Sequence, residues 1–182
     1  MAAIAAAAGQ SCGSEQPTQY DNFVAAAARA DTEGWKPYWL GRSFTAGGLT
    51  FRGPGIGDFG EPIEGGGTGY SYDAKIGSAG VELDLYVYSP SAWAAAEEIG
   101  RTRGPLGATI RDVKLAGYDA KLYVAKSAKQ NPDGVRADID IDGVVVRVQA
   151  GSVQAPGGAN LNPLTDEATF LAVMQNLRPY PQ

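Results

Sequence analysis

Residues 135–149 read VRADIDIDGVVVRVQ, and this stretch decides the fold. Apolar residues alternate with other residues before Asp142-Gly143, a dipeptide typical of two-residue β-hairpin turns, and an apolar run follows it. Such a turn pairs Ile141 with Val144, Ile139 with Val146 and Asp138 with Arg147. One face of the predicted hairpin is therefore apolar. The other face carries a cross-strand ion pair between Asp138 and Arg147 that contributes ~0.2–1 kcal/mol.

The same residues also match the opening of a calcium-binding loop. That loop needs a bidentate Glu at its twelfth position, where this chain has Gln149, and it needs flanking helices. Here the flanking residues are mostly Ile and Val, which favour strands. The hairpin therefore explains the pattern better and we expect no metal site, with a weak ion site at Asp138 and Asp140 as the alternative.

Strand patterns continue outward from the hairpin. Four consecutive segments, residues 109–115, 118–125, 135–141 and 144–149, are separated by turn residues and predict an antiparallel meander. Other expected strands and extended pieces are residues 37–44, 49–52, 70–73 and 81–88, with a long Gly-rich and Pro-rich loop over residues 53–69.

Helix signals flank these strands. Residues 20–30 are rich in helix formers, and Ser89-Pro90 begins a second helix that ends near residue 98. A C-terminal helix over about residues 165–177 has one apolar side, which should lie on the sheet. We therefore predict a single α+β domain over residues 20–182, with an antiparallel meander sheet packed by this helix and one or two others.

Composition excludes several classes of function. The 182 residues include no His and one Cys, and the formal net charge is −5. Catalytic triads that use His, Cys-His nucleophiles and the usual zinc sites are therefore excluded, and no cofactor is required. The absence of a Lys/Arg stripe argues against nucleic-acid binding. We assign no catalytic residue, and whether the protein is an enzyme stays open with a non-catalytic role favoured.

Residues 1–19 are expected to be a signal-like segment and a small polar tether. The alanine-rich start lacks the basic region of a signal peptide. One interpretation is a longer signal peptide that starts upstream of Met1, and Cys12 would then be the candidate for lipidation. An incidental cysteine in an alanine-rich end is the alternative. Because no later stretch reaches the roughly 18 apolar residues of a membrane span, membrane contact is expected only through this N-terminal anchor.

Two groups of residues are candidates for ligand binding. The aromatic candidates are Trp35, Tyr38, Trp39, Tyr70, Tyr72, Tyr86 and Tyr88. Aromatic rings beside carboxylates suit sugars and other amphipathic ligands, although a second core layer is the alternative role. The loop candidates are Asp58, Glu61 and Glu64, next to a Gly-x-Gly-x-x-Gly pattern at residues 55–60 that lacks the following helix of a nucleotide site.

Three short stretches carry a resemblance to a known group of proteins. They are residues 37–41 (PYWLG), 116–123 (AGYDAKLY) and 176–179 (NLRP). In these stretches the chain resembles uncharacterised bacterial exported lipoproteins, which implies export and a sheet-plus-helix fold. The expected function is a secreted or lipid-anchored, non-catalytic binding module for an envelope protein or glycan. A carboxylate-dependent glycan hydrolase and a structural subunit of an envelope assembly are the alternatives.

Overall fold

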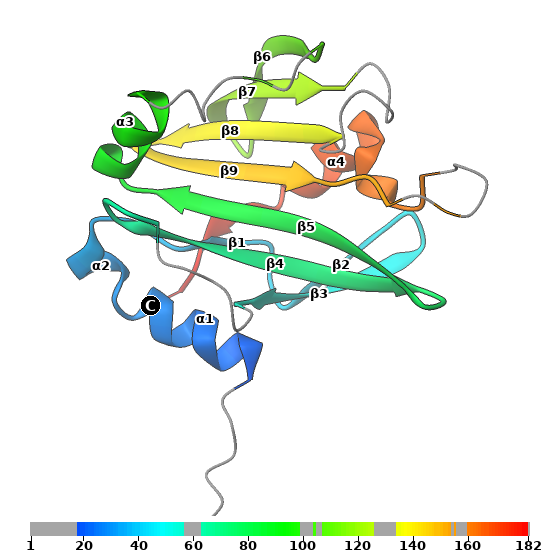
Figure 1. Ribbon diagram of the computed structural model, residues 1–182, viewed down its shortest axis with the longest axis horizontal. Helices are drawn as coiled ribbons and strands as arrows, with labels where there is room; N and C mark the ends of the chain where they lie inside the picture. The colour runs from blue at the N-terminus through cyan, green and yellow to red at the C-terminus, as the bar shows by residue number, and fades with distance from the viewer. Residues whose placement is uncertain are drawn as a thin grey trace, which may run out of the picture.

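An open antiparallel β-sheet is the centre of the computed structural model, which describes residues 18–56, 63–98, 104, 107–125, 134–153, 155 and 160–181 (Figure 1). Its strands are β2 (Ser43–Ala46), β3 (Leu49–Gly55), β4 (Gly67–Ile76), β5 (Ala79–Tyr88), β6 (Thr109–Leu115), β7 (Tyr118–Val124), β8 (Val135–Ile141) and β9 (Val144–Ala150). They lie in the order β2-β3-β4-β5-β9-β8-β7-β6, and every neighbouring pair is antiparallel. The sheet therefore consists of two four-stranded meanders that meet where β5 pairs with β9.

Helices and one small strand pair flank this sheet. They are α1 (Gln19–Ala27), α2 (Ala30–Glu33), α3 (Pro90–Glu98), the 3-10 turn η1 (Pro163–Thr165), α4 (Glu167–Met174), and the strands β1 (Tyr38–Trp39) and β10 (Arg178–Pro179), which pair with each other. In the view of Figure 1, α4 and β10 lie behind the sheet and α3 lies beside the left ends of β5, β8 and β9. The predicted single α+β domain is confirmed.

The hairpin that decides the fold forms as predicted. Ile141 pairs with Val144, Ile139 with Val146 and Asp138 with Arg147. Asp142 and Gly143 both have positive φ, at 53° and 83°, as a type I′ turn requires. The alternation of apolar residues and the Asp142-Gly143 turn together specify this register, because a shift by one residue would move the apolar side chains to the exposed face.

The helices differ from their predictions at their ends. Thr18 and Asp21 form a capping box that starts α1, but the helix ends at Ala27 and a separate turn, α2, follows. The start of α3 agrees with prediction, since the Ser89 hydroxyl accepts the Ala92 N–H at 3.2 Å. The C-terminal helix is shorter than predicted at both ends, because Asp166 caps its start and the helix ends at Met174. The predicted 53–69 loop is also shorter, since β3 continues to Gly55 and β4 begins at Gly67.

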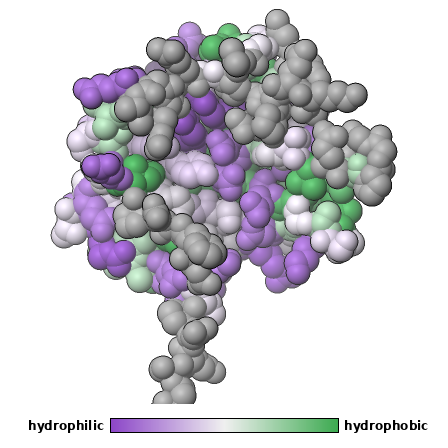
Figure 2. Space-filling view, viewed as in Figure 1, coloured by the Kyte–Doolittle hydropathy of each residue, from purple (hydrophilic) through white to green (hydrophobic). Residues whose placement is uncertain are grey.

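The two sides of the sheet differ in polarity. Val81, Leu83, Leu85 and Val87 of β5 are fully buried in one core cluster with the buried residues of α4, and we call this side of the sheet the packed face. The alternate residues of β5 lie on the other side, the polar face, together with Asp138 and Arg147. Figure 2 shows the polar face, with hydrophilic side chains gathered across the middle of the molecule. No helix in the described part of the chain is long and apolar enough to cross a bilayer.

Candidate functional site

A buried ionic cluster lies on the polar face where the two meanders meet. It consists of Arg136 and Asp138 on β8 and Arg147 on β9, and their exposed fractions are 5%, 7% and 6%. Nη2 of Arg136 donates to Oδ2 of Asp138 at 3.0 Å. Arg147 donates to both carboxylate oxygens, from Nε at 2.8 Å and from Nη2 at 3.1 Å. One carboxylate is thus bound by two guanidinium groups, and the Arg147 contact is bidentate.

The register of the hairpin produces this cluster. Asp138 and Arg147 are direct cross-strand partners, and Arg136 lies two residues before Asp138 on the same face. The sequence predicted the ion pair, but it missed Arg136 as a second cation and it missed the burial of the pair. The value of ~0.2–1 kcal/mol expected for a pair on an open sheet face therefore does not apply here.

Aromatic rings cover both guanidinium groups. The Arg147 guanidinium carbon lies 5.1 Å from the ring centre of Trp93 on α3 and 5.7 Å from that of Tyr88. The Arg136 carbon lies 4.1 Å from the ring centre of Tyr123 on β7. Burial alone would lower the pKa of Arg147, but the hydrogen bonds and the charge of Asp138 outweigh burial and raise this pKa. The guanidinium therefore stays charged beneath the rings, and cation–π attraction holds the rings over it.

A groove of about 690 Å³ lies beside the cluster, and we call it the acidic groove. Its lining residues are Trp93, Glu97, Asp112, Asp119, Ala120, Lys121, Tyr123, Asp138, Asp140 and Val145. Five of them are carboxylates and one is an amine. Two of the carboxylates have a lysine partner, because Lys121 contacts Asp112 at 3.2 Å and Lys114 contacts Asp119 at 2.6 Å. The groove thus combines two aromatic rings with many hydrogen-bond acceptors.

Some of the candidate residues predicted from sequence come together at this site. Asp138 and Asp140 both line the acidic groove, and Tyr88 packs edge-on against Trp93 with ring centres 5.3 Å apart. Tyr86 lies on the same face, opposite Arg147 in the register. Burial, with the nearby charge of Asp84, raises the pKa of Tyr86 to about 12, so its hydroxyl remains a hydrogen-bond donor at neutral pH.

The other predicted tyrosines belong to the core. Tyr70 and Tyr72 on β4 are 4% and 0% exposed, because they face Leu85 and Leu83 on the packed face. The Tyr70 hydroxyl donates to the carbonyl of Tyr38, itself buried. The Tyr72 hydroxyl accepts the Leu40 N–H at 2.8 Å and donates to the Gly41 carbonyl at 3.0 Å. These three tyrosines anchor the segment around β1, so the predicted aromatic platform is corrected to a core layer at these positions.

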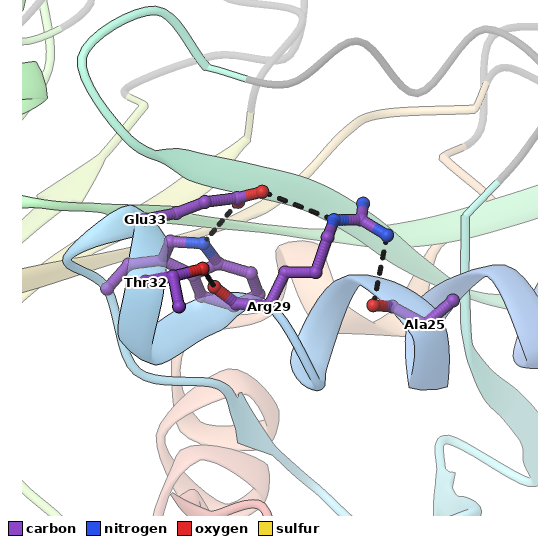
Figure 3. Close-up of polar contacts among 5 residues, drawn as sticks. Ala25, Arg29, Thr32 and Glu33 are labelled. Atoms are coloured by element: carbon purple, nitrogen blue, oxygen red, sulfur yellow. Dashed lines mark hydrogen bonds and ion pairs between the residues drawn. The ribbon is translucent and has the colours of Figure 1, made fainter.

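The two predicted tryptophans also lie apart from the groove. Trp35 is buried, and its indole N–H donates to Glu33 at 2.9 Å within the small network shown in Figure 3. In that network Arg29 bridges Glu33 and the carbonyl of Ala25, which ties α1 to α2. Trp39 is half-buried between the ring of Tyr180, with centres 4.9 Å apart, and the guanidinium of Arg178. Trp35 therefore has contacts that account for its position, whereas the indole N–H of Trp39 is buried and has no hydrogen-bond partner among the described residues.

Three further candidates cannot be placed at the site. Cys12, Asp58 and Glu61 lie outside the described residues. Glu64 is exposed in the turn before β4. Within the described ranges, no group of three or more Cys, Asp or Glu residues is arranged to hold a metal ion.

Sequence reasoning selected Tyr88 but missed Trp93 and Tyr123, the other two rings that cover the cluster. Trp93 lies in the helix predicted to start at Ser89-Pro90, and Tyr123 lies between apolar neighbours in a predicted strand. The sequence therefore indicated the element that carries each ring. The missing information was that α3 lies against β9, which is a tertiary contact. No family model, curated protein or solved structure matches the chain, so the geometry of this face is the basis for a functional proposal.

Proposed function

We propose that the protein is a non-catalytic binding module of the cell envelope that takes a glycan in the acidic groove. The observation that supports this proposal is the placement of the half-buried Trp93 ring among the groove carboxylates, beside Tyr123, which is itself buried. The Trp93 ring supplies apolar area for the face of a sugar, and carboxylates and Lys121 supply partners for its hydroxyl groups. The cation–π contacts with Arg147 and Arg136 hold both rings in place before ligand arrives, which lowers the entropic cost of binding.

The geometry favours binding over hydrolysis. A glycosidase needs two converging carboxyl groups, and one of them must be kept protonated by a water-poor environment. Asp138 is instead bound by two guanidinium groups, and both of its carboxylate oxygens already accept hydrogen bonds from arginine. Asp112 and Asp119 have side chains that are 87% and 81% exposed, and Asp140 and Glu97 are also exposed. These surroundings do not supply a general acid.

A structural subunit is also less well supported. An assembly subunit should present a broad apolar patch to its neighbours. Among the described residues, the large apolar side chains that are exposed are Val24 and Ile110, on α1 and β6. Two separate side chains do not make such a patch.

Replacing Trp93 by Ala should weaken glycan binding about tenfold, because a stacking ring contributes on the order of 1 kcal/mol or more to a contact of this kind. The measurement is isothermal titration calorimetry with soluble oligosaccharides, namely chitotetraose, cellotetraose, maltotetraose and peptidoglycan muropeptides. Trp93→Phe keeps a ring over Arg147 and should retain most of the affinity.

The matched control is Ile110→Ala, which removes an exposed apolar side chain from β6 outside the groove and should leave affinity unchanged. Equal affinities for the parent protein and the Trp93→Ala variant would refute the assignment of the groove. Release of reducing sugar by the parent protein would refute its non-catalytic role.

The envelope location is proposed from the signal-like start and Cys12. We expect the protein from its native host to begin at Cys12, to carry a lipid mass and to fractionate with membranes. Cys12→Ser should release it from that fraction. Intact-mass analysis of both forms checks this expectation, and an unmodified protein that retains Met1 in the soluble fraction would contradict it.

A further inference from the structure

The two edges of the sheet are protected to different degrees. β6 carries Arg111, Asp112 and Lys114, and charged side chains on an edge strand discourage pairing with other chains. β2, at the opposite edge, reads Ser-Phe-Thr-Ala and has no charged residue. The β2 edge therefore lacks the protection that the β6 edge has.

The register leaves main-chain groups of β2 pointing away from β3. Ala46 pairs with Leu49 across the Gly47-Gly48 turn, and the closing pair of such a turn exchanges hydrogen bonds. In an antiparallel pair of strands every second residue is hydrogen-bonded to the partner strand, so Phe44 is also bonded to β3. In agreement with this alternation, the Gly53 N–H donates to the Arg42 carbonyl at 3.1 Å. The N–H and C=O groups of Ser43 and Thr45 therefore face the open edge, and no hydrogen bond within the described part of the chain uses them.

A groove of about 710 Å³ runs along this open edge between β2 and α4. Its lining includes every residue from Leu40 to Gly47, together with Thr169, Ala172, Val173, Asn176 and Arg178. Phe44 and Ala172 contribute apolar surface to a lining that is otherwise mostly polar. Among the described residues of its lining, the charged ones are Arg42 and Arg178, and both are exposed. The groove is thus positively charged in a chain whose net charge is −5.

We propose that this edge binds an extended acidic peptide segment of a partner protein, which pairs with β2 as an added strand. Main-chain hydrogen bonds to Ser43 and Thr45 would supply affinity, and alternate apolar side chains of the peptide would enter the groove beside α4. Arg42 and Arg178 would select acidic residues of the peptide. This site is separate from the acidic groove on the polar face and does not depend on glycan binding.

A second copy of the chain suits this edge less well than an acidic peptide does. Pairing of β2 with β2 would bring the Arg42 and Arg178 side chains of both copies to one interface, where like charges are unfavourable. The charge of the groove is therefore the reason for assigning an acidic partner. Self-association remains a measurable outcome of the test.

Thr45→Pro tests the main-chain contact, because proline removes the outward N–H of Thr45 without removing a bond to β3. The probe is a fluorescein-labelled peptide of seven residues in which valine alternates with aspartate, and binding is followed by fluorescence anisotropy on the full chain. We expect about tenfold weaker binding for Thr45→Pro. Lys114→Pro is the matched control at the β6 edge, where the closing pair Leu115–Tyr118 likewise turns the Lys114 N–H outward, and its affinity should equal that of the parent.

Charge is tested with the double variant Arg42→Gln and Arg178→Gln and with a peptide in which lysine replaces aspartate. At low salt the double variant should bind the acidic peptide about fivefold less tightly, and the lysine peptide should bind the parent poorly. Amide chemical shifts of Ser43 and Thr45 should move on titration, which locates binding even if a variant folds badly. Absence of these shifts, equal binding of both peptides, or a parent dimer that Thr45→Pro converts to a monomer would each overturn the proposal.

Discussion

Replacing Asp138 by Asn lowers the free energy of unfolding by about 3–5 kcal/mol in our expectation, because it removes a buried negative charge that two buried guanidinium groups contact. Asn preserves the size of the side chain, so the loss isolates the charge and its hydrogen bonds. Arg136 and Arg147 are 5% and 6% exposed, and water cannot replace the carboxylate without opening the sheet face. Urea denaturation followed by circular dichroism at neutral pH measures the change.

Asp140→Asn is the control for this prediction. Asp140 lies on the same strand and the same face, but it is exposed, so its replacement should change stability by no more than about 0.5 kcal/mol. Similar losses for the two variants would mean that the buried cluster contributes nothing beyond a surface charge. If Asp138→Asn lowers the melting temperature but leaves the surroundings of the Trp93 ring unchanged, the rings do not depend on the cluster for their position.

The energetics of buried charge bear on the proposed role of the cluster in binding. A buried ion pair stabilises a fold little more than apolar residues of the same size, so stability alone does not account for three charged residues at this place. The cluster lies directly beneath Trp93 and Tyr123, and Asp138 also lines the acidic groove. Positioning of the rings is the role that the contacts support.

The sequence predicted those parts of the fold that depend on local pattern. The pairing of β8 with β9 follows from alternation and the Asp142-Gly143 turn, and the start of α3 follows from Ser89-Pro90. The pairing of β5 with β9 joins segments about 60 residues apart, and no local rule specifies it. The cover of Arg147 by Tyr88 and Trp93 depends on that pairing and on α3, so it was beyond sequence reasoning, whereas the ionic cluster itself lies on the predicted β8–β9 hairpin.

One feature of the site was within reach of the sequence. β4 and β5 are joined by a turn at Gly77-Ser78, which pairs Ile76 with Ala79. Counting back from this turn places Tyr70 opposite Leu85, a residue of the apolar face. Tyr70 and Tyr72 were therefore separable from Tyr86 and Tyr88 before the structure was known, because the two pairs occupy opposite faces of one hairpin.

Phe23→Ala is expected to destabilise the fold by about 3–5 kcal/mol, because a fully buried aromatic side chain leaves a large cavity when it is removed. Its ring packs edge-on against Tyr70 of β4 at 4.9 Å and against Tyr180 at 5.1 Å between ring centres. The Tyr180 N–H donates to the Pro37 carbonyl at 2.9 Å, so this ring joins α1, the large sheet and the C-terminal segment. Urea denaturation measures the loss.

Val24→Ala provides the control, because Val24 is the next residue of α1 and is 37% exposed. Its replacement should change stability by no more than about 0.5 kcal/mol, since alanine favours the helix and little apolar area is lost. Amide hydrogen exchange should show that Phe23→Ala speeds exchange at Tyr180 and in α1, while β8 and β9, whose pairing does not involve this ring, exchange only as fast as global unfolding allows. Loss of protection confined to α1 would instead mean that Phe23 anchors its own helix and that the C-terminal segment is held by the β1–β10 pair and by the contact of Tyr180 with Trp39.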